Sequence, residues 1–314
     1  MDNTLTSKIA NITDPVVSLA SRLLGERTGE VKTYSPDILV PIPRDLSIEY
    51  LGTTMKELGG EGFDLWYSYE FRCLTNQGLP VTSVIKFIIP HSSKNIIESK
   101  SFKLYCNGFT MERLGETKEE ALNNACRIMH DDLSKAVVDE VEVSVVQPRQ
   151  QVEVLTNYEE VTNLVDPKIT VSVYNEAPEL LKTKNTSQIK EYRIKYDAMR
   201  SKCRVTEQPD SGTIYVYYKS NIHLLEEGLV QYFSSFYDEC HFHEECLITI
   251  YKRIAELLHP EDSLLVCALY QRRGSLDIGP CHYQNIPQGT QEASIIYNLC
   301  KKAKFAYDPN NLYR

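Results

Sequence analysis

The sequence lacks the features that direct a chain to a membrane or a secretory route. Its first residues, MDNTLTSKIANITDP, have neither a basic start nor an apolar core, so they do not resemble a signal peptide. No apolar run approaches the ~18 residues that a membrane helix requires. The nine cysteines have no framework spacing, which is typical of free thiols in a reducing compartment. We therefore expect a cytoplasmic protein.

Several kinds of binding site are also missing. A net charge of −9 disfavours direct nucleic-acid binding, because phosphate contacts need a basic surface. LGGEGFD, residues 58–64, is no dinucleotide fingerprint, since it lacks the GxGxxG order. The sequence has no CxxC pair, so DECHFHEEC, residues 238–246, matches a structural zinc site poorly. We predict no bound metal, and any nicotinamide cofactor must bind outside a Rossmann fold.

The 314 residues, 42% of them hydrophobic, suit two globular domains, and each half shows the same predicted order of elements. Aromatic and β-branched runs indicate strands, and apolar residues at helical spacing indicate helices. The first half has predicted strands at 63–73 and 80–89, helices at 95–110 and 118–137, and a strand at 139–146. The second half has predicted strands at 190–206 and 212–219, helices at 224–239 and 243–258, and a strand at 263–272.

The two halves are also similar in their residues. The stretch 95–109 aligns with 222–236, which places Tyr105 opposite Tyr232. Chance similarity between short amphipathic segments is the alternative explanation. We predict an α+β protein built from a duplicated module, with the helices on one face of an antiparallel sheet. The polar stretch 148–167 would connect the two copies.

Two stretches carry groups that could do chemistry. In RSKCRVTEQPDSG, residues 200–212, Cys203 could be a nucleophile and Asp210 its proton source. However, Pro-Asp-x-Gly is also ordinary turn chemistry, and buried cysteines usually act as small hydrophobic residues. In the second stretch, His243 and Glu244 at a predicted helix start could move a proton and accept hydrogen bonds, or could simply be solvated.

Two basic stretches could contact phosphate groups. ESKSFK, residues 98–103, places Lys100 and Lys103 on one face of a predicted helix near its N-terminus. RRGSLD, residues 272–277, places two adjacent arginines before a glycine. Both stretches are also consistent with a solvated basic surface, so these residues alone leave the choice open.

Together, IESKSFK, CRVTEQPD, FHEEC and RRGSLDI resemble the motifs of the NADPH-dependent 7-cyano-7-deazaguanine reductases, the QueF-type nitrile reductases of queuosine biosynthesis. The resemblance is to the two-module branch and covers most of residues 40–282. It implies two tandem tunnelling-fold (T-fold) modules and assembly as a homodimer. The modules would span residues 41–150 and 168–282, between an N-terminal extension, 1–40, and a C-terminal tail, 283–314.

The resemblance also implies an activity, the four-electron reduction of 7-cyano-7-deazaguanine to 7-aminomethyl-7-deazaguanine by two NADPH. It assigns catalysis to Cys203, which would form a covalent thioimide, to Asp210 as proton donor and to His243 as a proton relay. The implied substrate-binding residues are Ile97, Glu98, Ser99, Phe242, His243 and Glu244. The implied NADPH-binding residues are Ser99, Lys100, Lys103, Arg272, Arg273 and Gly274.

The sequence departs from the family pattern in three places. Ser211 stands where relatives usually have an aromatic residue, Ser275 stands where they often have a second glycine, and the C-terminal tail is long and unassigned. Cys73 occupies the repeat position of Cys203 without a following Pro-Asp, so we interpret it as structural. Three alternatives remain: amine addition to the same thioimide, as in amidinotransferase-like relatives, a zinc-dependent cyclohydrolase on the same fold, and a non-catalytic module that binds deazapurines.

Overall fold

The computed structural model describes residues 15–20, 33–146, 155, 157–272 and 274–299. The strands are β1 (Pro41–Pro43), β2 (Glu61–Leu74), β3 (Pro80–Pro90), β4 (Asn95–Ile97), β5 (Glu142–Val145), β6 (Glu159–Glu160), β7 (Thr183–Lys202), β8 (Pro209–Leu224), β9 (Ser263–Tyr270) and β10 (Leu276–Gln284). The helices are α1 (Pro15–Ala20), α2 (Arg44–Ser47), α3 (Met55–Leu58), α4 (Ser99–Gly108), α5 (Lys118–Val137), α6 (Glu226–Ser234), α7 (His243–Ala255) and α8 (Gln291–Tyr297). None of these described helices has the length and apolar character needed to cross a bilayer.

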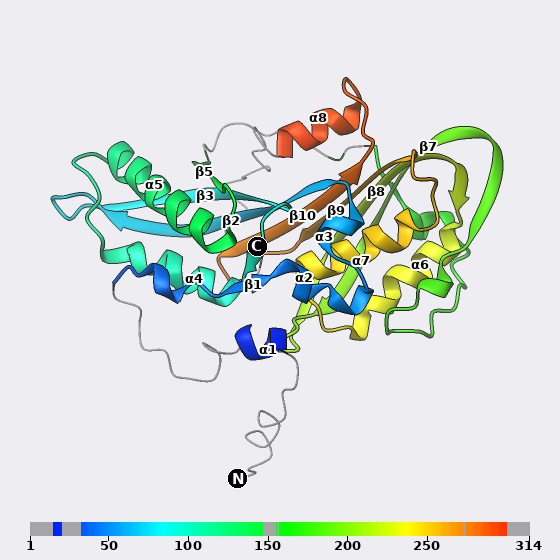
Figure 1. Cartoon of the computed structure of the whole chain (residues 1–314), viewed down its shortest axis with the longest axis horizontal. Coiled ribbons are helices and arrows are strands. Elements are labelled where there is room, and N and C mark those ends of the chain that lie inside the picture. Colours follow the sequence, from blue (N-terminus) through cyan, green and yellow to red (C-terminus); the bar gives the residue numbers. More distant parts are fainter. Residues whose placement is uncertain (1–14, 21–32, 147–154, 156, 273, 300–314) are drawn as a thin grey trace, which may run out of the picture.

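A sheet of eight strands runs through both halves of the described chain (Figure 1). Its strand order is β5-β3-β2-β10-β9-β8-β7-β6, and only the pairing of β6 with β7 is parallel. A separate small sheet pairs β1 with β4. The predicted α+β class and antiparallel sheet are therefore confirmed.

Each half contains the predicted order of two strands, two helices and a strand. Helix α5 has the predicted bounds, because Thr117 caps its first turn and Val138 ends it with a left-handed backbone, φ 62°. Tyr105 in α4 and Tyr232 in α6, which the alignment places opposite each other, are both fully buried. The order of elements and these two tyrosines thus agree with the internal similarity.

Strand β10 joins the two halves, and the sequence pattern did not predict it. Residues Leu276 to Tyr283 pair with β2, with Ile278 opposite Trp66, and the end of β10 pairs with β9. The strand contains Gly279 and Pro280, and both residue types are depleted in strands. The pairing makes the sheet continuous. The predicted module boundaries are untested and stay a prediction.

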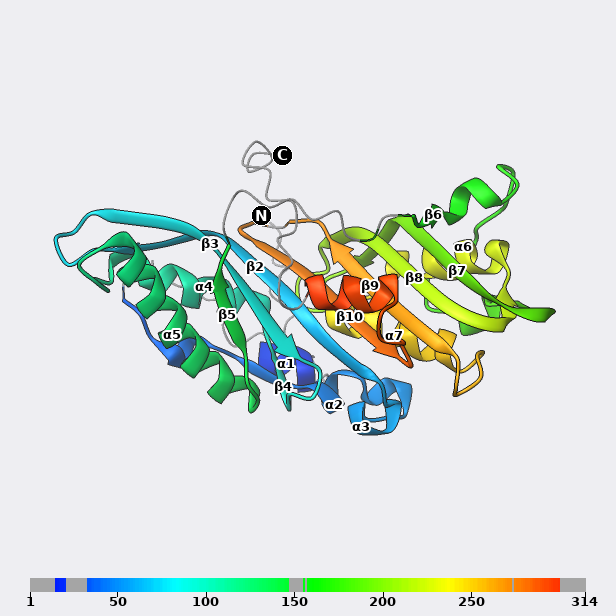
Figure 2. The same ribbon diagram turned by 90° about the horizontal axis from the view of Figure 1, so that it is seen from above.

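Helices α4 to α7 pack on one face of the sheet. In the first half, Trp66 of β2 contacts the ring of Phe102 of α4, with centroids 4.8 Å apart. In the second half, Ile250 of α7 belongs to the same buried cluster as Val216 of β8. The prediction placed all helices on one face, but α8 lies on the opposite face (Figure 2). There Ile295 belongs to a separate buried cluster. Part of the predicted tail is therefore a packed helix.

The predicted helix at 95–110 begins too early. Asn95 to Ile97 form β4, which pairs with β1. Glu98 has an extended backbone and caps α4, so the helix begins at Ser99. The β-branched pair of isoleucines suits a strand better than a helix start.

Candidate active site

A cavity of about 290 Å³ is lined by residues of both halves. It lies where β1 and β4 meet the N-termini of α4 and α7. The lining residues are Ile42, Trp66, Ile96, Ile97, Glu98, Ser99, Lys100, Lys103, Cys203, Val205, Thr206, Gln208, Asp210, His241, Phe242, His243, Glu244, Gln271, Gly274, Leu276 and Ile278. The fold therefore brings together all the residues predicted for catalysis and substrate binding, from stretches far apart in the chain.

The β7–β8 hairpin places Cys203 and Asp210 on the same face. Ser201 pairs with Asp210, and the N–H of Cys203 donates to the carbonyl of Gln208 at 2.8 Å. Because residues two apart on a strand share a face, Cys203 and Asp210 are diagonal neighbours. The turn lies between Cys203 and Pro209. Pro209 and Asp210 therefore begin β8, whereas their residue types predicted that they form the turn.

His243 lies beside Asp210. Its Nε2 is 3.5 Å from Oδ2 of Asp210, which is buried. The imidazole packs against the ring of Tyr270, with centroids 3.9 Å apart, and this contact fixes its position at the start of α7. An imidazole next to a buried carboxyl group can pass a proton to it or take one from it.

Glu244 brings a buried carboxyl group to the cavity. Its exposed fraction is 6%, and its Oε1 has no hydrogen-bond partner among the described residues. Burial raises the pKa of Glu244 to about 8; the negative charge of Asp64 adds to the rise, and Arg44 opposes it. A buried polar atom without a partner is costly unless a ligand supplies one, so Glu244 is suited to accept an N–H donor.

Glu98 faces the same cavity but already has partners. Its carboxylate accepts the backbone N–H of Lys100 at 2.8 Å and that of Ser101 at 2.6 Å, which caps α4. Burial raises the pKa of Glu98, and these two bonds oppose the rise. Each oxygen can accept a further bond, so the capping role does not exclude contact with a ligand.

Lys103 lies against Gly274, whose φ is +65°. A Cβ added at Gly274 would be 2.6 Å from Nζ of Lys103. Lys100 and Lys103 thus bring two ammonium groups to the cavity beside the N-terminus of α4. Arg272 is not among the lining residues; its guanidinium lies over the ring of Tyr69, 4.9 Å from the centroid. Arg273 is outside the described residues.

A buried chain of polar groups lies behind Glu244. Nη2 of Arg44 donates to Asp64 Oδ2 at 2.5 Å, and Oδ1 of Asp64 is 2.8 Å from Nε2 of His91. His91 Nδ1 is 2.8 Å from Nδ1 of His282. Although burial alone would raise it, Arg44 and His91 hold the pKa of Asp64 at about 2. Asp64 therefore keeps the negative charge that helps to raise the pKa of Glu244.

Two family models match this chain. The model described as "Nitrile reductase, 7-cyano-7-deazaguanine-reductase N-term" matches residues 31–145, and the model described as "QueF-like protein" matches residues 209–288. A relative from Colwellia psychrerythraea, named NADPH-dependent 7-cyano-7-deazaguanine reductase, is 32% identical over 86% of this chain and 94% of its own length. A relative of the same name from Hahella chejuensis is 38% identical over 82% and 91%. The chain belongs to the 7-cyano-7-deazaguanine reductase family.

Family membership confirms the resemblance that the motifs indicated, while the roles of single residues stay predictions. Cys73 is fully buried and does not line the cavity, and burial raises the pKa of its thiol. Ser275 is buried, and its carbonyl accepts the N–H of Tyr69. Ser211 is half-buried in β8, next to Asp210. The described residues contain no group of three His, Cys, Asp or Glu side chains that could hold a metal ion.

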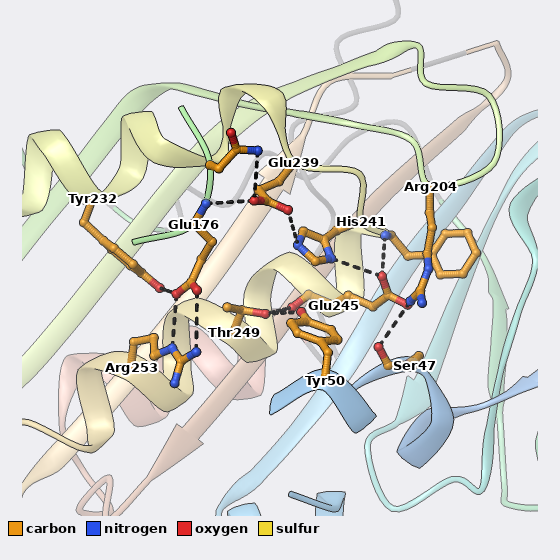
Figure 3. A network of polar contacts seen from close by, with 12 residues as sticks. Ser47, Tyr50, Glu176, Arg204, Tyr232, Glu239, His241, Glu245, Thr249 and Arg253 are labelled. Atoms are coloured by element: carbon orange, nitrogen blue, oxygen red, sulfur yellow. Dashed lines mark hydrogen bonds and ion pairs between the residues drawn. The ribbon is translucent and has the colours of Figure 1, made fainter. Parts of the chain in front are cut away.

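A second polar network lies beside the cavity, and the sequence did not indicate it. Figure 3 shows its residues. It includes Arg204, His241 and Glu245, of which only His241 lines the cavity. His241 was considered as a zinc ligand, but it lies between two carboxylates, those of Glu239 and Glu245. The spacing of histidine and acidic residues in DECHFHEEC was the available signal.

Proposed function

We propose that this chain is an NADPH-dependent nitrile reductase that converts 7-cyano-7-deazaguanine to 7-aminomethyl-7-deazaguanine in queuosine biosynthesis. The family and the names of its relatives support the reaction. One observation carries the proposal for this site: Glu244, whose Oε1 has no hydrogen-bond partner in the described part of the chain, shares a cavity with Cys203 and Asp210. A thiol, an acid and a buried acceptor are the groups that this reaction needs.

Cys203 would begin the reaction. A nitrile carbon is a weak electrophile, so the attacking group must be a thiolate. Its sulfur would bond to the nitrile carbon, and the nitrile nitrogen would take a proton from Asp210, which gives a covalent thioimide. His243, 3.5 Å from Asp210, would then return a proton to that carboxylate.

The remaining steps require reduction and enclosure. Two molecules of NADPH would each supply one hydride, and the two hydrides together with two protons would turn one nitrile into a primary amine. Cys203 leaves as a thiolate when its bond to carbon breaks, and the imine so formed must be kept from water until it is reduced. The walls formed by Ile97, Phe242 and Trp66 would exclude that water. Asp210 and His243 would supply the second proton.

The acidic residues would recognise the deazaguanine ring. The ring carries an N–H beside an exocyclic amine, a pair of donors that carboxylates can bind. Glu244 and Glu98 would accept from this edge, Ser99 would lie beside it, and Phe242 would pack against the ring. A base without these donors would leave the buried carboxyl group of Glu244 without a hydrogen bond. Its affinity should therefore be much lower than that of deazaguanine.

Basic residues near the N-terminus of α4 would hold NADPH. Lys100 and Lys103 offer the ammonium donors that phosphate groups need, at a helix N-terminus that also favours anions. Ser99 and the backbone at Gly274 would complete the contact. The resemblance adds Arg272 and Arg273 to this set.

We further propose two T-fold modules per chain and a cytoplasmic homodimer. The repeated strand and helix order supports the modules. The cysteines within the described residues are free thiols, which is typical of a reducing compartment. Light scattering at several protein concentrations would give the mass of the assembly, and a monomeric mass would contradict the dimer.

The deciding experiment is a stoichiometric titration of 7-cyano-7-deazaguanine with excess NADPH. We expect two NADPH to be oxidised for each nitrile consumed. A count of zero, with the mass of one nitrile added at Cys203, would favour amine addition to the thioimide instead. Binding without turnover or adduct would favour a non-catalytic module.

Replacing the nucleophile gives a second test. Cys203→Ala should abolish the adduct, detected as protein mass after incubation with the nitrile alone. Cys126→Ala is the matched control, because Cys126 is a half-buried thiol that does not line the cavity. An adduct that persists in Cys203→Ala would assign the nucleophile to another residue.

A further inference from the structure

One carboxylate connects the turn that carries Cys203 to helix α7 (Figure 3). Glu245 is fully buried, and its Oε1 accepts a hydrogen bond from Nη1 of Arg204 at 2.6 Å. Its Oε2 accepts the N–H of Phe242 at 2.9 Å, which caps α7. Arg204 follows Cys203 directly in the chain. Glu245 therefore holds the nucleophile's turn and the first turn of α7 in one place.

His241 extends the network with alternating charge. Its imidazole lies between Glu239 at 3.3 Å and Glu245 at 3.5 Å. Although burial alone would lower it, the two carboxylates raise the pKa of His241 to about 9. The ring of Tyr50 stacks on His241, with centroids 5.1 Å apart. The Glu245 carboxylate thus has a cation on either side, His241 and Arg204.

Backbone hydrogen bonds hold this turn at Lys202, where β7 ends. The N–H of Lys202 donates to Glu239, and the N–H of His241 donates back to Lys202. Within the turn, Cys203 bonds to Gln208 and Glu207. The bonds of Cys203 within the turn are local, whereas the Arg204–Glu245 pair, like the bonds of Lys202, joins the turn to a distant part of the chain, with residues 41 apart. The pair is therefore a long-range constraint on the position of Cys203.

We propose that the Arg204–Glu245 ion pair is a positioning device for Cys203. The inference rests on the proposed function. Glu244, which would bind the substrate ring, and Glu245, which anchors the turn of the nucleophile, are adjacent in α7. One helical turn would thus set the distance between the bound nitrile and the attacking sulfur. Arg204 is not a catalytic residue in this scheme, since it acts through Cys203.

The test separates substrate binding from bond formation. In Arg204→Ala, we expect the rate of nitrile adduct formation at Cys203 to fall about 100-fold, because a displacement of about 1 Å costs that much at a reacting centre. The Kd for the nitrile should change less than about threefold, because Glu244 remains in place. Alkylation of Cys203 by iodoacetamide should be as fast as before or faster, since a small free reagent does not need the fixed geometry.

Rescue by added guanidinium ion distinguishes a lost ion pair from a general loss of stability, because guanidinium would not restore the adduct rate of a variant that is merely destabilised. At concentrations well below those that unfold the protein, it should restore a large part of the adduct rate in Arg204→Ala by occupying the site beside Glu245. Arg204→Lys should retain an intermediate rate, because lysine keeps the charge but loses the planar fork. It also serves as the test variant if Arg204→Ala does not fold.

Arg200→Ala is the matched control. Arg200 lies on β7, just before the turn, and its Nη1 donates to the carbonyl of Tyr237 at 2.6 Å; Arg200 does not line the cavity. This variant should form the adduct at the normal rate and show no response to guanidinium. A normal adduct rate in Arg204→Ala, or a Kd raised as much as the rate is lowered, would overturn the inference. Absence of adduct in the unaltered protein would instead overturn the proposed function, and the inference with it.

Discussion

The carboxyl group of Glu244 is mostly protonated near neutral pH in the ligand-free protein, because burial raises its pKa to about 8. Ring N–H donors bind the ionised form better, so the ligand should lower that pKa. Binding at pH 7 should therefore release up to one proton, and affinity should rise as pH increases from 6 to 8. Calorimetry in buffers of different ionisation enthalpy measures this release.

Glu244→Gln is the comparison for this measurement. The amide cannot ionise, so the proton release should disappear, and the Kd should increase by a factor that corresponds to about 1–3 kcal/mol. The free energy of unfolding at pH 7 should not fall, since Oε1 has no partner to lose among the described residues and the amide lacks the cost that the raised pKa imposes above pH 4.5. Equal proton release in the variant would show that another group titrates on binding.

At the level of elements, the loop before β10 should control the position of Lys103. Gly274 has a φ of +65°, so alanine there costs about 1 kcal/mol in backbone strain, and its Cβ would displace Nζ of Lys103. We expect Gly274→Ala to raise the KM for NADPH several-fold. Formation of the adduct from nitrile alone should stay unchanged.

Gly289→Ala is the matched control for this loop. Gly289 has a φ of +82°, and a Cβ there would meet nothing within 4 Å. It should lose a similar amount of stability in thermal unfolding without any change in the KM for NADPH. If both variants have the same kinetics, Lys103 does not contribute to cofactor binding.

Elements with strong periodicity could be predicted from the sequence, and those set by partners far away could not. Helix α5 carries its own caps, so its bounds follow from local residues. Strand β10 contains Gly279 and Pro280, and only its pairing with β2 and β9 makes it a strand. Strand β4 similarly depends on β1. Local propensity does not contain that information.

The same distinction holds for the cavity. Cys203, Asp210 and Glu244 could be predicted because each belongs to a short motif of the family. The Arg204–Glu245 pair could not, because two charged residues 41 apart look like ordinary surface charge until the fold brings them together. Trp66 was likewise predicted only as part of a strand, and its place in the cavity wall depends on β10.

For the whole molecule, His282 links stability to pH. It lies in β10, with Nε2 2.8 Å from the carbonyl of Gly59 and Nδ1 2.8 Å from His91. Burial and the neighbouring His91 lower its pKa from 6.5 to about 3. The unfolded chain therefore binds a proton below pH 6.5 that the folded protein does not. This contribution is complete above pH 6.5 and is lost as pH falls towards 3, by about 1.4 kcal/mol per pH unit.

Comparison with His282→Gln isolates this group from others that titrate in the same range. Glu244 acts in the opposite direction. Because its pKa is raised in the folded protein, its contribution to stability decreases as pH rises from 4.5 to about 8. Urea unfolding of both proteins at pH 7.5, 6.5 and 5.5 should show that their stability difference shrinks below pH 6.5. A difference that does not vary with pH would contradict the lowered pKa of His282.

The position of β10 in the chain also has a consequence for synthesis on the ribosome. Strand β2 ends at Leu74, but β10, its partner at the centre of the sheet, is complete only at Gln284. At typical elongation rates, about 10 to 40 s pass between the two. During that interval β2 has an open edge, and such edges pair readily with other chains. A nascent chain of this protein is therefore expected to need protection by a chaperone until β10 emerges.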